Sequence, residues 1–376
     1  MKNLKTPIWL LLFVCALAFS HCKDKESCDD AIMNQDETAV DCGGVCEACA
    51  TCSDGIRNQN ETGVDCGGVC PNACSIISNL RQYNTANSDI PSDNVREMWW
   101  DGTSLWLATD AGVGVLTNET WVVYNTSNSM LPSDDVRDFW QANDGSMWMT
   151  TANGVARLNN GTWTIYNSGT GAPAQLNNAG HIVQALNWTI VTTPGSGFMI
   201  YDTFTWTSYT TANSSLPTDN LTDVDANPLQ EVYFGSADSG VVTFSNFNFG
   251  TLNTSNSPIL NNTINSLILT GDGDLWIGSQ GGLSFKSSAN AWDNWSEANS
   301  PITHPSVDVL TRDQYGEVWM RSPLSLTNFV PTGNVWTLYT EANSSNMLNT
   351  ATCMRVESGT QAKWVGTAGY GLLVFN

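Results

Sequence analysis

Residues 136–166 read VRDFWQANDGSMWMTTANGVARLNNGTWTIY, and this stretch decides the fold. Apolar and polar residues alternate within short runs, which is the period of a β-strand with one buried face. We expect four strands, at residues 136–140, 147–151, 155–158 and 162–166. Asparagine and glycine fill the intervals, as tight hairpin turns with positive φ require. The stretch therefore predicts a small antiparallel sheet.

The same unit recurs seven times. Its outer landmark is a bulky residue followed by a polar run, found at Tyr83, Tyr124, Tyr166, Tyr209, Leu252, Trp295 and Tyr339. An inner landmark falls in phase at Trp106, Trp148, Ile190, Tyr233, Trp276, Trp319 and Trp364. A period of about 40–45 residues with four short strands per unit is typical of propeller blades. The sequence predicts an all-β fold, a seven-bladed β-propeller over residues 76–376.

The ends of the repeat predict how the ring closes. Only three strands fit after Tyr339, around residues 353–356, 363–366 and 371–375. The missing fourth strand is present at the front, at residues 79–83. We expect it to pair with the last three strands, because closure removes the free sheet edges that invite aggregation. We accordingly expect a monomer.

Charge limits the partners. The chain carries 36 acidic and 14 basic residues, a net charge of −22. Such a surface is repelled by phosphate backbones, which excludes nucleic acid as a partner.

The N-terminus has the form of a secretion signal, predicted at residues 1–21. Lys2 and Lys5 precede an apolar run at residues 8–19, which is too short to span a bilayer. Cys22 and the charged residues after it resemble a bacterial lipoprotein signal, in which that cysteine is lipidated, and residues 22–27 then form an anchor linker. Simple cleavage after Ser20 is the alternative. In either case we expect no chain segment to cross the membrane.

Two cysteine-rich modules follow, at residues 28–50 and 51–75. Each is too small for a self-sufficient core and carries four cysteines, so in an exported chain we expect disulfides. The cysteines are Cys28, Cys42, Cys46, Cys49, Cys52, Cys66, Cys70 and Cys74. Four cysteines allow three pairings, so the connectivity stays open. Zinc is the competing interpretation of the CxxC spacings.

Oxygen-bearing side chains within the second module suggest calcium. Asp54, Asn58, Glu61 and Asp65 are closely spaced on a glycine-containing loop, which suits a hard cation. The same side chains also cap turns for structural reasons alone.

Both repeat types resemble known ones. The pattern YNTxNSxLPSDxV…DGxxWxxTxxGV…W is similar to the two-component-regulator propeller repeat of bacterial sensors and surface lipoproteins. The cysteine modules resemble DGxxNxxETxVDCGG repeats, which act as stalks or spacers in secreted and surface-anchored bacterial proteins. These resemblances imply a propeller held at the cell envelope, as an outer-membrane or cell-surface lipoprotein.

Candidate ligand contacts are the residues that break the repeat. Tryptophans that recur in phase are expected to pack between blades, whereas the less regular ones offer exposed indole faces. Variable residues near the start of each innermost strand lie close to the central channel. The candidate residues are Arg96, Trp99, Trp100, Arg137, Trp140, His181, Asn265 and Asp308.

No reactive cluster stands out, and no catalytic residue is assigned. The favoured function is non-catalytic binding or scaffolding of an extracellular glycan, peptide or protein. The first alternative is a lyase or glycosidase that uses His181 with an acidic neighbour such as Asp308. The second is a structural adhesin or stalk, which predicts no pocket. Cys353 is expected to be a small buried apolar residue; a disulfide between Cys22 and Cys353 is a remote alternative.

Overall fold

The computed structural model describes residues 77, 79–227, 231–340, 344, 346–357 and 360–376. These residues belong to one compact unit that spans Ser75–Asn376. The predicted signal peptide, the lipidation site Cys22, both cysteine modules and the calcium ligands lie outside the described residues and stay predictions.

The described residues form seven four-stranded antiparallel sheets, which confirms the seven-bladed propeller. Blades 1 to 3 are built from β2 (Val95–Trp100), β3 (Leu105–Thr109), β4 (Gly112–Thr117), β5 (Thr120–Tyr124); β6 (Val136–Gln141), β7 (Met147–Thr151), β8 (Gly154–Asn159), β9 (Thr162–Tyr166); and β10 (Ile182–Ala185), β11 (Trp188–Thr192), β12 (Phe198–Tyr201), β13 (Trp206–Tyr209). Two short 3-10 helices, η2 (Ser168–Thr170) and η3 (Ala174–Asn178), lie between blades 2 and 3.

Blades 4 to 6 are built from β14 (Leu221–Ala226), β15 (Val232–Ser236), β16 (Val241–Ser245), β17 (Asn248–Leu252); β18 (Ile264–Leu269), β19 (Leu275–Ser279), β20 (Gly282–Lys286), β21 (Trp292–Trp295); and β22 (Val309–Arg312), β23 (Val318–Ser322), β24 (Ser325–Val330), β25 (Val335–Thr340). The 3-10 helices η4 (Pro331–Gly333) and η5 (Asn346–Thr350) flank β25. Within the described residues, no helix has the length and apolar character needed to cross a membrane.

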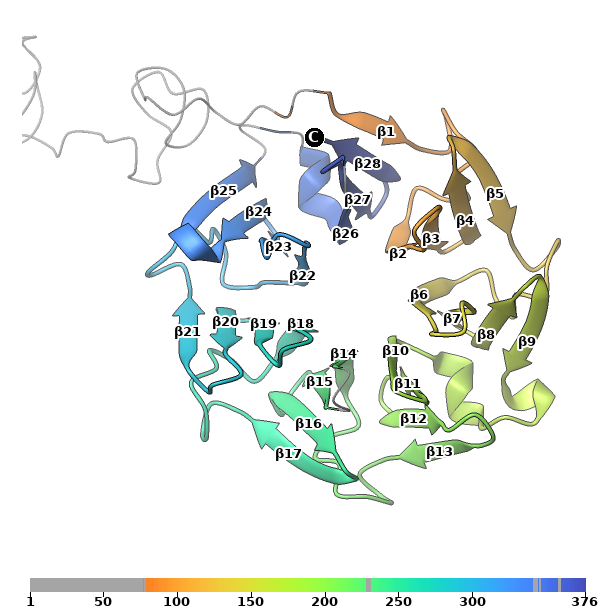
Figure 1. Ribbon diagram of the computed structural model, residues 1–376, viewed down its shortest axis with the longest axis horizontal. Coiled ribbons are helices and arrows are strands. Elements are labelled where there is room, and N and C mark those ends of the chain that lie inside the picture. Colours follow the sequence, from red (N-terminus) through yellow and green to blue (C-terminus); the bar gives the residue numbers. More distant parts are fainter. Residues whose placement is uncertain (1–76, 78, 228–230, 341–343, 345, 358–359) are drawn as a thin grey trace, which may run out of the picture. The chain divides into compact units, whose positions relative to one another are not determined.

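The two ends of the propeller share blade 7. Its sheet has the order β1-β28-β27-β26, with β1 (Arg81–Tyr83), β26 (Ala351–Val356), β27 (Lys363–Thr367) and β28 (Leu372–Phe375). Gln82 stands opposite Leu373 in the antiparallel register. The predicted closure is confirmed, with a closing strand two residues shorter at its start than expected. Figure 1 shows the seven sheets around a ring, with the innermost strands β2, β6, β10, β14, β18, β22 and β26 at its centre.

The polar run between blades folds by bonding to itself. In the loop after β5, the amide of Asn125 donates to the side-chain oxygen of Asn128, at 2.8 Å. The amide of Thr126 donates to Asp134, at 2.7 Å. The same bond joins Thr85 to Asp93 and Thr211 to Asp219. The repeated Asn and Asp residues of this run therefore form a loop whose side chains accept hydrogen bonds from its own backbone N–H groups.

One glycine of the repeat is required by close backbone contact. Gly154 begins β8 at a φ of 129°, and a side chain there would meet the carbonyl oxygen of Tyr166 at 2.7 Å. Gly112 occupies the same place in blade 1, where the clash with Tyr124 would be 2.4 Å. Only glycine fits this position without strain.

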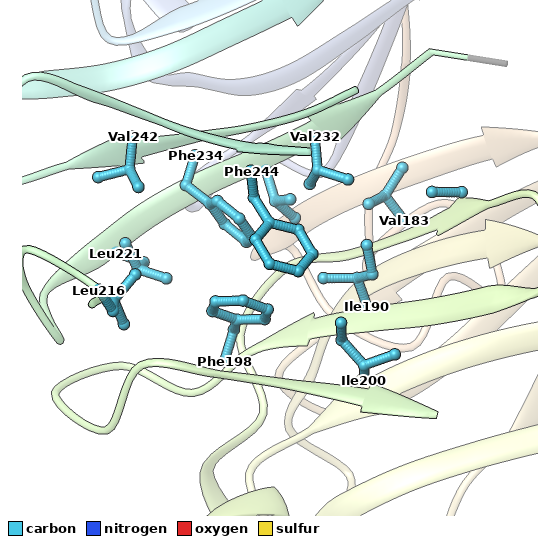
Figure 2. Close-up of a cluster of buried hydrophobic side chains, with 12 residues drawn as sticks. Val183, Ile190, Phe198, Ile200, Leu216, Leu221, Val232, Phe234, Val242 and Phe244 are labelled. Atoms are coloured by element: carbon cyan, nitrogen blue, oxygen red, sulfur yellow. The ribbon is translucent and has the colours of Figure 1, made fainter. Parts of the chain in front are cut away.

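The core lies between neighbouring blades. Figure 2 shows the largest of these clusters, where Phe198 of blade 3 meets Phe234 and Phe244 of blade 4. The rings of Phe198 and Phe234 are 4.6 Å apart, and all three side chains are buried. Burial of each such side chain contributes roughly 1.5–3 kcal/mol, so the blade interfaces carry much of the stability.

The two landmarks of the repeat stack on each other. Trp148 lies parallel to Tyr166, with ring centroids 5.5 Å apart. The same pairing joins Trp106 to Tyr124, Trp276 to Trp295, Trp319 to Tyr339 and Trp364 to Tyr83. Trp106 and Trp148 also contact Phe139 and Tyr201 of the next blade, as expected for tryptophans that pack between blades. Cys353 is free and buried, which also agrees with the sequence.

Candidate functional site

A cavity of about 310 Å³ lies at the centre of the ring. All seven innermost strands contribute residues to its wall. Such a central cavity is the usual place for a ligand in a propeller, because side chains from every blade converge there.

Five of the eight predicted ligand contacts line this cavity. They are Trp99, Trp140, His181, Asn265 and Asp308. The other three lie elsewhere. Arg96 forms an ion pair with Asp135, at 2.8 Å, and Trp100 lines a separate cavity near the closure of the ring. Arg137 donates to the side chain of Asn178 and the carbonyl of Ala179, which ties blade 2 to the loop before blade 3.

The structure also brings in charged residues that sequence reasoning missed. They are Glu97, Asp138, Asp223, Asp225, Arg312 and Arg355. The cause is a β-bulge near the start of most innermost strands, for example between Val95 and Glu97 in β2. A bulge places two residues opposite one and re-aims the side chains that follow.

Blade 3 differs, because β10 pairs with β11 without a register shift. Ile182 stands opposite Val191 there, as Phe139 stands opposite Met149 in blade 2. His181 is therefore level with Asp138 rather than with Arg137. Asp223 and Asp225 alternate along one strand, and this spacing was the sequence signal that could have placed both carboxylates on the cavity wall.

Three of the carboxylates join neighbouring blades. The inner edge of each innermost strand has no further strand beside it, so its N–H groups need other acceptors. Each carboxylate accepts one bond from its own strand and one from the next blade. The pairs are Phe139 and Ile182 for Asp138 (2.7 and 2.9 Å), Val224 and Leu267 for Asp223 (both 2.8 Å), and Ala226 and Leu269 for Asp225 (both 2.8 Å). We call these three residues the carboxylate clamps.

His181 lies between two of the clamps. Its Nδ1 is 3.3 Å from Asp138 and 3.7 Å from Asp223, and the side chain is 45% exposed because it projects into the cavity. Burial lowers the pKa of His181, but the hydrogen bond to Asp138 and the charges of Asp223 and Glu97 outweigh it and raise the pKa to about 9. The imidazole is therefore protonated at neutral pH.

A second charged pair borders two indole rings. Arg355 lies 3.6 Å from Glu97, with its guanidinium 5.9 Å from the centre of the Trp99 ring. The rings of Trp99 and Trp140 are 5.2 Å apart. Burial raises the pKa of Glu97 to about 7 although Arg355 opposes this effect. The indole N–H of Trp99 is buried and has no hydrogen-bond partner among the described residues.

The opposite part of the wall is a polar network. Arg321 donates to Asp308, and Ser306 donates to the other oxygen of the same carboxylate. The side-chain amide of Asn265 donates to Asp308 at 3.3 Å and to the carbonyl of Val307 at 3.0 Å. Asp308 is thus paired rather than free, and it lies in a different network from His181.

The arrangement bears on catalysis. A general base needs an unprotonated group within reach of the substrate, but His181 is protonated and held by carboxylates. Within the described part of the chain, no group of three or more histidine, cysteine or acidic side chains has the geometry of a metal site.

No protein-family profile and no curated protein matches the chain. Solved structures do resemble it. Two are extracellular domains of proposed hybrid two-component systems of B. thetaiotaomicron, at 18% and 15% identity with TM-scores of 0.65 and 0.67; each match covers 79% of this chain. The chain spans only 41% and 42% of those chains. A third is virginiamycin B lyase from Staphylococcus aureus, at 11% identity and a TM-score of 0.62, covering 79% of this chain and 99% of that chain. At these identities the likeness establishes the propeller fold alone.

Proposed function

We propose that this is an exported surface protein whose propeller binds an extracellular glycan, peptide or protein in its central cavity without catalysis. The observation that carries the proposal is the wall of the cavity. Its carboxylates and its histidine are engaged with the backbone and with each other, whereas the Trp99 and Trp140 indoles line open space. Large aromatic faces beside a few fixed polar groups are typical of ligand sites.

Export and anchoring rest on the N-terminal sequence. The apolar run at residues 8–19, Cys22 and the eight cysteines of residues 28–75 support a lipid-anchored protein of the cell envelope. The extracellular origin of the two B. thetaiotaomicron domains is in line with this location. Mass spectrometry of the mature N-terminus tests it: a diacylated Cys22 is expected, and an unmodified N-terminus at His21 contradicts the anchor.

Binding is tested on glycan and peptide arrays with the whole mature protein. The decisive variant is Val309→Phe, because Val309 lines the cavity and a larger side chain narrows it. Val335→Phe is the matched control, since Val335 is 54% exposed and lies on β25, outside the cavity. We expect Val309→Phe to lose the wild-type array signal and Val335→Phe to keep it. No signal with the wild type, or equal signals from all three proteins, contradicts the proposal.

A lyase or glycosidase is the second candidate, favoured only by the position of His181 in the cavity. Virginiamycin B lyase has been crystallised as a catalytically inactive histidine variant, so a propeller can carry such chemistry. Each array ligand is therefore incubated with the protein and its mass measured. We expect ligands to be recovered intact. Cleavage that disappears in His181→Asn would replace the binding proposal by the enzymatic one. A purely structural adhesin predicted no pocket, and the cavity weighs against it.

A further inference from the structure

A second cavity, of about 190 Å³, lies where the last blade meets the first. Its wall comes from β1 and β27 of blade 7 and from β2, β4 and two turns of blade 1. We call it the seam cavity. Trp99 and Trp100 are adjacent on β2, so their indoles leave opposite faces of the sheet. Trp99 lines the central cavity and Trp100 lines the seam cavity.

Two wall residues of the seam cavity are not part of the repeat. The strand pairings place no other aromatic residue level with Trp100; its counterparts are Gln141, Gln184, Ala226, Leu269, Arg312 and Val356. Arg81 likewise has no basic counterpart; the equivalent residues are Val122, Thr164, Thr207, Gly250, Asp293 and Thr337. The other blades close without a tryptophan level with Trp100 or an arginine level with Arg81, and here Trp100 also packs against the buried cluster between blades 7 and 1.

The polar side chains of the seam cavity form a neutral pair. Arg81 lies 5.3 Å from the centre of the Tyr83 ring, donates to its hydroxyl and reaches Glu119 at 3.4 Å. Arg81 and Glu119 are 59% and 79% exposed, so water and ligands reach both. Trp364 stacks on Tyr83, and its buried indole N–H has no hydrogen-bond partner among the described residues.

We propose that the seam cavity binds one sugar ring of a neutral saccharide. The apolar C–H face of a pyranose packs on an indole, here Trp100, while its hydroxyl groups bond to polar side chains at the edge, here Arg81 and Glu119. The volume is below the roughly 300–1,000 Å³ of sites for drug-sized ligands, which suits a single ring. The opposite charges of Arg81 and Glu119 favour a neutral ligand over an ionic one. This site is separate from the central cavity and does not depend on its function.

The test is calorimetric titration of the mature protein with neutral tetrasaccharides of glucose, mannose, xylose and N-acetylglucosamine, and with a galacturonic acid tetramer as a charged probe. At least one neutral probe is expected to bind. Trp100→Ala is expected to weaken that binding at least tenfold, which corresponds to about 1.4 kcal/mol. Glu119→Gln weakens it severalfold without a risk to folding, since this side chain is mostly exposed. Phe204→Ala, at a side chain that is 87% exposed and lines neither cavity, leaves the affinity unchanged.

Several results overturn the proposal. One is that no neutral probe binds, or that only the charged probe does. Another is that Trp100→Ala and Glu119→Gln, both folded by circular dichroism, keep the wild-type affinity. If Val309→Phe abolishes binding of a neutral probe and Trp100→Ala does not, the sugar occupies the central cavity. That last result overturns the seam site while it supports the function proposed for the centre of the ring.

Discussion

Asp225 is the residue at which stability and pH are most directly linked. Burial, the main effect, raises the pKa of Asp225 to about 7, although the N–H groups of Leu269 and Ala226 oppose it. The usual aspartate value of 3.8 applies to the unfolded chain. Between about pH 4 and pH 7 the folded protein therefore binds more protons than the unfolded chain at this site. Stability consequently falls as the pH rises through that window.

The magnitude follows from the pKa difference. The pKa of Asp225 differs by about three pKa units between the folded and unfolded states, and each unit corresponds to about 1.36 kcal/mol. The upper bound on the change in stability is therefore roughly 4 kcal/mol. The variant Asp225→Asn no longer titrates. Its side chain has one acceptor oxygen, like the protonated carboxyl group that Asp225 carries in the folded protein at pH 4. We therefore expect similar stabilities at pH 4 and expect the variant to gain on the wild type by up to ~4 kcal/mol by pH 8.

Urea unfolding of both proteins at half-unit steps from pH 4 to pH 8 measures this difference, and other titrating groups cancel in the comparison. Asp202→Asn is the matched control. Asp202 also accepts two backbone N–H bonds, from Phe204 and Thr205, but it is exposed and its pKa is lowered by those bonds. Its replacement should cost a nearly constant amount of stability from pH 4 to pH 8, because its folded-state pKa and the usual value of 3.8 both lie below that range, so this curve stays parallel to that of the wild type. Parallel stability curves for wild type and Asp225→Asn would refute the assignment of the titration to Asp225.

Three further outcomes are expected. Gly366→Ala places a methyl group 2.5 Å from the sulfur of Cys353 and should lower the free energy of unfolding by about 1–3 kcal/mol in chemical denaturation. Gly271→Ala meets no atom and should be neutral or slightly stabilising. Equal effects of the two variants would contradict the packing around Gly366. Tyr83→Ala removes the ring that stacks in blade 7 and should lower the free energy of unfolding by about 2–4 kcal/mol. The Phe204 side chain is 87% exposed, so Phe204→Ala should lower it by about 0.5 kcal/mol or less. Cys353 is buried, and burial raises the pKa of its thiol; peptide mapping should find it alkylated by iodoacetamide only after unfolding, and labelling of the native protein would argue against a closed blade 7.

The sequence predicts much of the architecture because each blade is a local structure. The four strands of a blade follow one another and are joined by short turns, so alternation and glycine-containing turns specify them without reference to distant residues. The number of repeats then gives the number of blades. Even the long-range pairing of Arg81–Tyr83 with Leu372–Val374 was predictable, because a three-stranded remainder left one partner to find.

The candidate site was only partly predictable. Trp99, Trp140 and His181 stood out because they break the repeat, and they line the cavity. Asp223 and Asp225 did not, because a bulge shifts the register by one residue and changes which side chains turn toward the axis. Such a bulge is a property of how two strands pair, and the amino-acid sequence of one strand alone does not predict it.

What the sequence by itself determined is the strand order and the number of blades, because these depend on contacts between neighbours in the chain. The shared last blade followed from the repeat, which left three strands at the end without a fourth. What only the tertiary structure decided is the role of the charged residues. His181, Asp138 and Asp223 are some 40 residues apart from one to the next, and it is the closing of the ring that places them within 4 Å. The raised pKa of His181 and the hydrogen bonds of the two aspartates follow from that proximity, which no local pattern encodes.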